Sequence, residues 1–157
     1  MTASRKAPTR HEAGDLPDLN VWLALALAEH PHHRAAQAYW QEQAAARVWF
    51  CRVTMLGLVR LLCQPRLMGE AALGLRGAFD VYLRFAALPE VGQCAEPADC
   101  EQLLSGLLEP ATPARLWTDA YLAAFALAGG LRLVTFDRDF TRFGAISKLQ
   151  LGSGVRS

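Results

Sequence analysis

The segment LRLVTF, residues 131–136, is the most convincing strand in this sequence. It is an almost continuous apolar run that only Arg132 and Thr135 interrupt, which is typical of a strand covered by helices on both faces. The glycine pair at 129–130 precedes it, and glycine favours a helix end because it adopts the left-handed conformation without strain. Asp137 follows the run at once. We therefore expect a helix and then a buried strand, with a carboxylate standing at the end of that strand.

The same alternation of apolar runs and helical patterns extends outward along the chain. Strands that alternate with helices predict a parallel sheet in a three-layer α/β domain, whose ligand site lies beyond the carboxyl ends of the strands. Thr54 and Thr112 are the expected N-caps of two helices, and Pro113 follows the second as a first helical residue. Pro17 requires a short first strand, since proline is normally confined to sheet edges or strand starts. The expected strands cover residues 16–19, 47–53, 91–96, 131–136 and 147–151, and the expected helices cover 20–29, 31–46, 54–63, 70–87, 98–108 and 113–129.

Length and charge limit the classes of protein to which this chain can belong. With 157 residues, 52% of them hydrophobic, the chain can bury one core but is too short for two ordinary domains. We expect a polar tail at 1–14 and a single domain at 15–157. The net charge of +1 excludes the global positive field of many nucleic-acid binders. Any contact with RNA must therefore come from local patches.

The sequence also predicts the cellular location of the protein. Its apolar stretches are far shorter than the roughly 20 residues that a membrane-spanning helix needs. No secretory signal precedes the four cysteines, and none of them forms a CxxC pair. We expect reduced thiols, no membrane contact and a cytoplasmic location.

Three aspartates are placed so that the predicted sheet would gather them. Asp18 and Asp137 fall at the C-terminal ends of expected strands, and Asp119 lies on the helix that leads into the strand at 131–136. Each has a plainer explanation by itself, as a helix cap, a solvated residue or a turn residue. Carboxylates this close raise one another's pKa unless a cation neutralises them. An all-oxygen set predicts Mg²⁺ or Mn²⁺, which can support the hydrolysis of a phosphodiester.

Four segments in order give the chain a resemblance to the PIN-domain family, and within it to the VapC branch of toxin–antitoxin modules. The similarity runs from about Asp15 to Leu151. The segments are LPDLNVWLALALAEHPHH at 16–33, TMLGLVRLL at 54–62, TDAYLAAFAL at 118–127 and LVTFDRDFTRF at 133–143.

This resemblance implies a fold, an activity and partners. It implies a PIN-like domain with a central parallel sheet flanked by helices, and a metal-dependent endoribonuclease that cleaves RNA as the toxin of a type II system. Asp18, Asp119 and Asp137 would be the catalytic residues and the ligands of Mg²⁺ or Mn²⁺. The resemblance further implies a homodimer that a cognate VapB-like antitoxin inhibits by covering the cleft. The residues that would support the site are Asn20, Thr118 and Asp139.

One position departs from the family pattern. Many relatives carry a glutamate directly after the threonine of the second segment, where this chain has Met55. Methionine is a poor ligand for a hard cation, so three acids remain instead of four, which favours one metal ion. The alternative is a catalytically weakened PIN fold that acts as a binding module for RNA or for its antitoxin. A phosphatase of the haloacid dehalogenase type is disfavoured, because it needs an acid where this chain has Asn20.

Other side chains have weaker claims to a function. Arg60, Arg138 and Arg142 are candidates to contact RNA phosphates, although each is equally a solvated residue or an ion-pair partner of the acids. His30, His32 and His33 surround a helix start and are expected to be exposed. The tryptophans, including Trp117, are expected to belong to the core.

Overall fold

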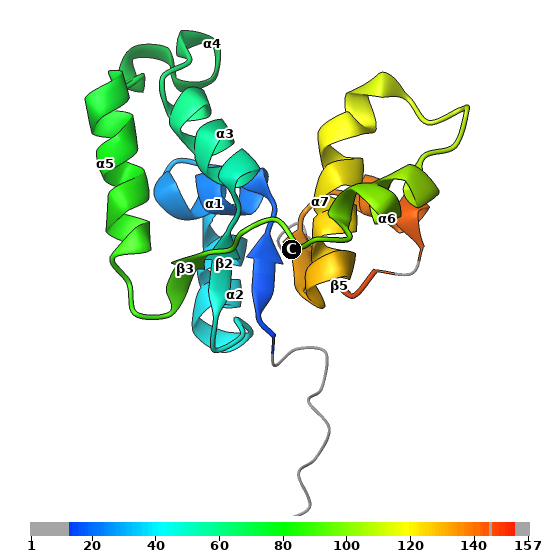
Figure 1. Ribbon diagram of the computed structural model, residues 1–157. Coiled ribbons are helices and arrows are strands. Elements are labelled where there is room, and N and C mark those ends of the chain that lie inside the picture. Colours follow the sequence, from blue (N-terminus) through cyan, green and yellow to red (C-terminus); the bar gives the residue numbers. More distant parts are fainter. Residues whose placement is uncertain (1–12, 145, 153–157) are drawn as a thin grey trace, which may run out of the picture.

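The fold is built on a five-stranded sheet whose strands all run parallel (Figure 1). The computed structural model describes residues 13–144 and 146–152. The strands lie in the order β3-β2-β1-β4-β5, so β1 stands in the middle and the chain crosses it between β3 and β4. Their bounds are β1 Asp15–Pro17, β2 Val48–Phe50, β3 Val91–Gln93, β4 Arg132–Thr135 and β5 Lys148–Gln150.

Helices cover both faces of the sheet, which confirms the expected three-layer α/β fold (Figure 1). Within the described residues no helix is long and apolar enough to cross a membrane. The helices are α1 Leu19–Ala26, α2 His33–Glu42, α3 Arg52–Leu62, α4 Pro65–Met68, α5 Leu75–Ala86, α6 Cys100–Leu107 and α7 Trp117–Gly129, and the 3₁₀ turns are η1 Gly69–Ala71, η2 Ala114–Leu116 and η3 Arg138–Phe143.

Side chains of the strands alternate between two cores, as the period of two requires. Leu133 of β4 packs with residues of α6 and α7 on one face. The next residue, Val134, packs with Val21 of α1 and Tyr39 of α2 on the other face. Trp22 of α1 belongs to a neighbouring apolar cluster with β2, α3 and α5, where its ring stacks on Phe50 at 3.7 Å between centroids. The sheet therefore holds a core on each side.

Several local expectations need correction. Thr54 does not cap α3: Cys51 is the N-cap, and Thr54 lies three residues later, where its hydroxyl accepts a hydrogen bond from the Cys51 N–H at 3.0 Å. Thr112 does not cap α7, because its hydroxyl accepts from the N–H of Glu109 and the turn η2 intervenes. The helix expected at 70–87 begins at Leu75, after α4 and η1. The expected end of α7 is confirmed, since Gly130 is its left-handed cap with φ 64°.

Pro17 occupies the last residue of the central strand rather than an edge or a strand start. The N–H of Asp15 donates to the carbonyl of Arg47 beside β2 at 2.9 Å. Because alternate residues of a strand face the same neighbour, the nitrogen of Pro17 also faces β2 and has no hydrogen to donate. Only Asp15 and Val48 are paired in the β1–β2 ladder, whereas three residue pairs join β1 to β4.

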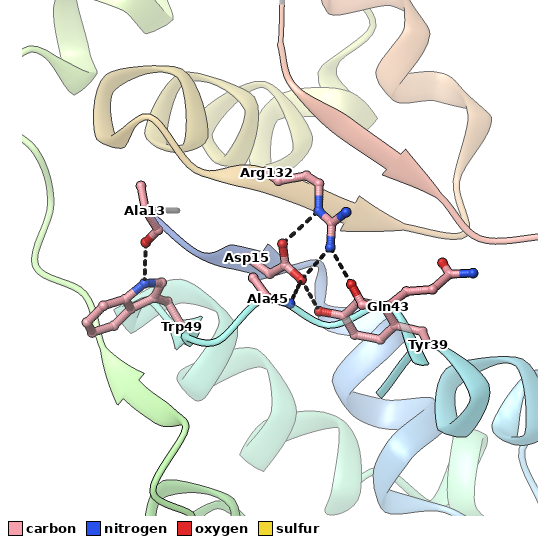
Figure 2. A network of polar contacts seen from close by, with 7 residues as sticks. All are labelled: Ala13, Asp15, Tyr39, Gln43, Ala45, Trp49 and Arg132. Carbon is pink, nitrogen blue, oxygen red and sulfur yellow. Dashed lines mark hydrogen bonds and ion pairs between the residues drawn. The ribbon is translucent and has the colours of Figure 1, made fainter. Parts of the chain in front are cut away.

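Ala13 and Gly14, the first residues that the structure describes, contact the rest of the domain and lie just before the expected boundary at residue 15. Ala13 accepts a hydrogen bond from the indole of Trp49 at 3.0 Å (Figure 2). Gly14 has φ 110°, and a Cβ there would stand 2.6 Å from that indole nitrogen, so only glycine fits. The remainder of the expected tail, 1–12, lies outside the described residues.

A buried ion pair joins β1 to β4. Arg132 donates to both carboxylate oxygens of Asp15, at 2.7 and 2.9 Å. Figure 2 shows the other partners that surround this carboxylate. The hydroxyl of Tyr39 and the N–H of Ala45 both donate to it, and Arg132 also donates to the carbonyl of Gln43. The Asp15 side chain is fully buried and that of Arg132 is 14% exposed, so the pair ties two strands to α2 and the loop after it.

We expect Arg132→Met to lower the free energy of unfolding by about 3–5 kcal/mol, because it leaves a buried carboxylate without its cation. Urea unfolding followed by circular dichroism measures this loss. The control is Arg76→Met, which breaks the pair with Asp80 whose side chains are 74% and 49% exposed. That variant should lose less than about 1 kcal/mol. Equal losses in the two variants would show that the buried pair does not stabilise the sheet.

Candidate active site

The candidate site lies at the carboxyl edge of the sheet, between β1 and β4. The chain leaves β1 toward β2 on one side and later returns through β4 on the other side, which makes this edge a topological switch point. Asp18 directly follows β1, and Asp137 lies two residues beyond the end of β4. Ligands of open α/β sheets bind in such a crevice.

A chain of hydrogen bonds fixes the two aspartates at this edge. The N–H of Asp18 donates to the carbonyl of Val134 at 2.8 Å, which continues the ladder between the strands. The buried hydroxyl of Thr135 donates to Asp18 Oδ2 at 3.0 Å and accepts from the N–H of Asp137 at 2.9 Å. The carboxylate of Asp137 in turn accepts from the N–H of Asp139 at 2.8 Å. Thr135 therefore positions both acids, a role that its place in an apolar run did not reveal.

Asp18 is a nearly buried carboxylate, with 6% of the residue exposed. Burial raises its pKa, the hydrogen bond from Thr135 opposes this shift, and the charge of Asp137 adds to it. Asp18 stands at the N-cap position of α1, yet its side chain makes no capping hydrogen bond. The plainer explanation of Asp18 as a helix cap therefore holds for its position, whereas its carboxylate is held by Thr135.

Asp119 reaches the same edge from the first turn of α7. Its pKa rises to about 6, first because it is partly buried and then because Asp18, Asp137 and Asp139 repel its charge. A helix N-terminus favours an anion by about 0.3–1 kcal/mol, so burial and repulsion outweigh that contribution here. Asp119 thus lies close enough to Asp18 and Asp137 for their charges to contribute to its pKa.

Arg115 of η2 is a cation beside this cluster, and no pattern in the sequence indicated it. Its guanidinium donates to Asp139 Oδ2 at 2.8 Å. The pair is open to solvent, with side chains 64% and 41% exposed, so screening leaves it little strength. The pKa of Arg115 is raised by Asp139 most, and also by Asp137 and Asp119. One exposed arginine does not neutralise four carboxylates.

The other predicted residues differ in whether they adjoin this cluster. Asn20 lines a cavity together with Asp137. Thr118 is exposed and adjoins Asp119 on α7, and Arg138 and Arg142 are exposed on η3. Arg60 lines a separate cavity between α3 and α5.

Met55, at the position of the missing glutamate, lines the same α3–α5 cavity as Arg60. It also packs against the apolar cluster of Trp22 and Leu58. Its surroundings are therefore those of a core-facing residue.

Two expectations about aromatic residues are wrong. His30, His32 and His33 are half-buried rather than exposed, because the turn between α1 and α2 folds back on the sheet edge. His33 Nδ1 lies 2.7 Å from the carbonyl of Ala24. Trp117, at the start of α7, is 57% exposed and does not belong to the core.

The donor atoms of the cluster fit a hard divalent cation, since three carboxylates offer only oxygen ligands. Within 13–144 and 146–152, no three acidic, histidine or cysteine side chains are arranged as a group that could hold a metal ion. The backbone gathers the aspartates, whereas their side chains do not converge on one point.

Comparison with known sequences yields a family and close relatives. The model of the PIN domain matches residues 16–146. Ribonuclease VapC41 of Mycobacterium tuberculosis is 41% identical over 137 residues, which are 83% of this chain and 94% of that protein. Ribonuclease VapC38 of the same organism is 33% identical over 122 residues, 78% of this chain and 84% of that protein.

Solved structures show the same fold. The crystal structure of M. tuberculosis VapC20, described as a toxin that cleaves the sarcin–ricin loop, superposes with a TM-score of 0.62 at 22% identity, over 84% of this chain and 96% of that one. VapBC2 from Rickettsia felis, bound to a DNA fragment from its promoter, superposes with a TM-score of 0.60 at 11% identity, over 87% of this chain and 98% of that one.

We expect Asp119→Asn to raise the melting temperature in EDTA, and to do so more at pH 8 than at pH 5. The folded pKa of about 6 exceeds the ordinary value of 3.8, so the folded state holds this proton more tightly than the unfolded state. The stability of the native protein therefore falls as the pH rises from about 4 through 6. Each 1 kcal/mol of relief corresponds to roughly 2–4 °C in a domain of this size.

Differential scanning calorimetry at the two pH values measures the effect. Asp80→Asn on α5 is the control, because its carboxylate pairs with an exposed arginine. It should shift the melting temperature little and equally at both pH values. A gain for Asp119→Asn that does not depend on pH would contradict the repulsion among the acids.

Proposed function

Because this chain belongs to the PIN-domain family, in its branch of VapC-type ribonucleases, we propose that it is a metal-dependent endoribonuclease. It cleaves RNA phosphodiesters as the toxin of a type II toxin–antitoxin system. The observation that carries the proposal is the link between Asp18 and Asp137 through the Thr135 hydroxyl at the carboxyl edge of the sheet. Asp119 adjoins them, and their charges contribute to the rise of its pKa to about 6. Three carboxylates that repel one another at a switch point provide a reason for a cation to bind there.

In this proposal Asp18, Asp119 and Asp137 hold Mg²⁺ or Mn²⁺. The bound ion supplies charge stabilisation at the phosphoryl group and lowers the pKa of a water molecule. The hydrogen bond of 3.0 Å from Thr135 orients the Asp18 carboxylate and opposes the rise that burial causes in its pKa. Asp139 has a supporting part, since its N–H orients Asp137 and its carboxylate engages Arg115.

Contacts with RNA and with protein partners complete the proposal. Arg138 and Arg142 on η3 follow Asp137 in the chain and are exposed, which suits contact with the phosphates beside the cleaved bond. Arg60 is a weaker candidate, because it lines the α3–α5 cavity. A VapB-like antitoxin is the proposed inhibitor, in line with the VapBC2 complex that shares the fold. Thr118 and Asn20 flank the acids, and we place the protein in the cytoplasm as a homodimer.

A weakened PIN fold that only binds RNA or antitoxin is the second candidate. Its support is Met55, which offers no oxygen ligand and packs against apolar residues. The three aspartates argue against it. Without a cation, their mutual repulsion would destabilise the fold and serve no chemical purpose. The assay below separates the two candidates.

We expect Asp18→Asn and Asp119→Asn to reduce the cleavage of a pool of structured cellular RNAs by at least roughly two orders of magnitude, because ligation of the cation contributes several kcal/mol. The assay runs purified protein with Mg²⁺, with Mn²⁺ and with EDTA, and maps the cut sites. Cleavage at discrete sites should need a divalent cation.

Asp80→Asn is the matched control in this assay, since it removes a carboxylate from α5 outside the cluster. It should cleave like the native protein. Full activity of both site variants would contradict the assignment of the metal ligands. No cleavage by folded, antitoxin-free native protein with either metal would favour the binding module.

A further inference from the structure

A cavity of about 780 Å³ opens directly beside the acid cluster. It is lined by the turn between α1 and α2 and by Leu67, Met68 and Ala71 of α4 and η1. Asn20 and Asp137 line the end that adjoins the acids. The volume falls within the roughly 300–1,000 Å³ that is usual for small-ligand sites.

Flat rings form one wall of this cavity. His32 stacks on Phe136 with ring centroids 4.5 Å apart and planes inclined by 18°. His30 lies 5.7 Å from His32, centroid to centroid. The N–H of His32 donates to His30 Nδ1 at 3.1 Å, so Nε2 carries the proton of the neutral His30 ring and can donate to a ligand. Burial, together with the two neighbouring histidines, lowers the pKa of His30, which keeps that ring neutral at pH 7.

The charge of the cavity determines what it can accept. Glu29 and Asp137 are its charged lining residues, and no lysine or arginine is among the described residues that line it. A phosphate would therefore meet negative charge without a cation. An uncharged planar group suits the cavity better, because it can stack on an aromatic wall and hydrogen-bond to polar groups at its edge.

We propose that this cavity binds a nucleobase of the RNA strand next to the phosphodiester at the acid cluster, stacked on the wall of His32 and Phe136. The inference rests on the proposed function and gives it a base-binding subsite. Asn20 and Asp137 belong both to the cavity and to the edge where the strand would react, so a base on the adjoining nucleotide lies within reach. This continuity favours RNA over a protein side chain as the occupant.

The test measures binding apart from cleavage. The host is the Asp18→Asn variant in Mg²⁺, and the probes are fluorescein-labelled RNA hexamers, one of six adenylates and one with the same ribose-phosphate backbone but no bases. Fluorescence anisotropy should show roughly tenfold weaker binding of the abasic probe, within the range that stacking of one base supplies.

Variants of the cavity then locate this difference. His32→Ala removes the stacking ring. Ala71→Trp fills the cavity from η1 and leaves the histidines unsubstituted. Each should reduce the affinity for the adenylate probe to that of the abasic probe. His32→Phe keeps a flat ring and should preserve the difference. Gln37→Ala, on the exposed face of α2, is the control that should change nothing.

The outcomes separate this inference from the proposed function. Discrimination between the probes that survives both His32→Ala and Ala71→Trp would overturn the inference, because a base would then bind elsewhere. Equal binding of both probes to the host would also overturn it and leave the cavity to a protein side chain. RNA cleavage by the native protein without this discrimination keeps the nuclease and rejects the subsite. Discrimination without cleavage keeps the subsite and rejects the nuclease.

Discussion

The buried pair of Asp15 and Arg132 sets the alignment on which the rest of the molecule depends. These two residues are register partners on β1 and β4, and their side chains meet where water is excluded. A slip by one residue would turn every side chain of β1 to the opposite face and leave a buried charge unpaired. The same register places the N–H of Asp18 on Val134 and the hydroxyl of Thr135 on the Asp18 carboxylate. The ion pair of Asp15 and Arg132, at the start of β1 and β4, thus helps to fix the geometry at the carboxyl edge.

The carboxyl edge itself works against stability. Asp18 loses solvation, Asp119 has its pKa raised to about 6, and an exposed arginine gives only partial compensation. Residues kept at such a cost are common at functional sites, where stability is exchanged for activity. The two cores and the Asp15 network supply the rigidity that holds the like charges near one another. We therefore expect the buried charge pair and the proposed metal ligands to have opposite effects on the free energy of unfolding.

The sequence predicts the layers of this fold better than its local contacts. The apolar run at 131–136 and the glycine cap after α7 depend on local chemistry, so both were predictable. Asp18 and Asp137 could be placed at one edge because parallel strands end together. The roles of Thr135, of Arg115 and of the histidines between α1 and α2 were missed. These roles depend on strand order and on contacts between segments that are distant in the sequence. The prediction of the α3 N-cap was wrong for a local reason. Cys51 occupies the N-cap position, although threonine is the more usual residue there, and Thr54 lies three residues later.

Pro17 has a dynamic consequence. Its nitrogen cannot join the ladder with β2, so a single residue pair connects β1 to β2 while three connect it to β4. Local opening takes place where backbone hydrogen bonds are fewest. The seam between β1 and β2 is therefore the line of backbone pairing most prone to open, and the packing of Trp22 of α1 on Phe50 of β2 opposes that opening. Such opening would change the approach to Asp18, which directly follows β1, while the ladder between β1 and β4 stays paired.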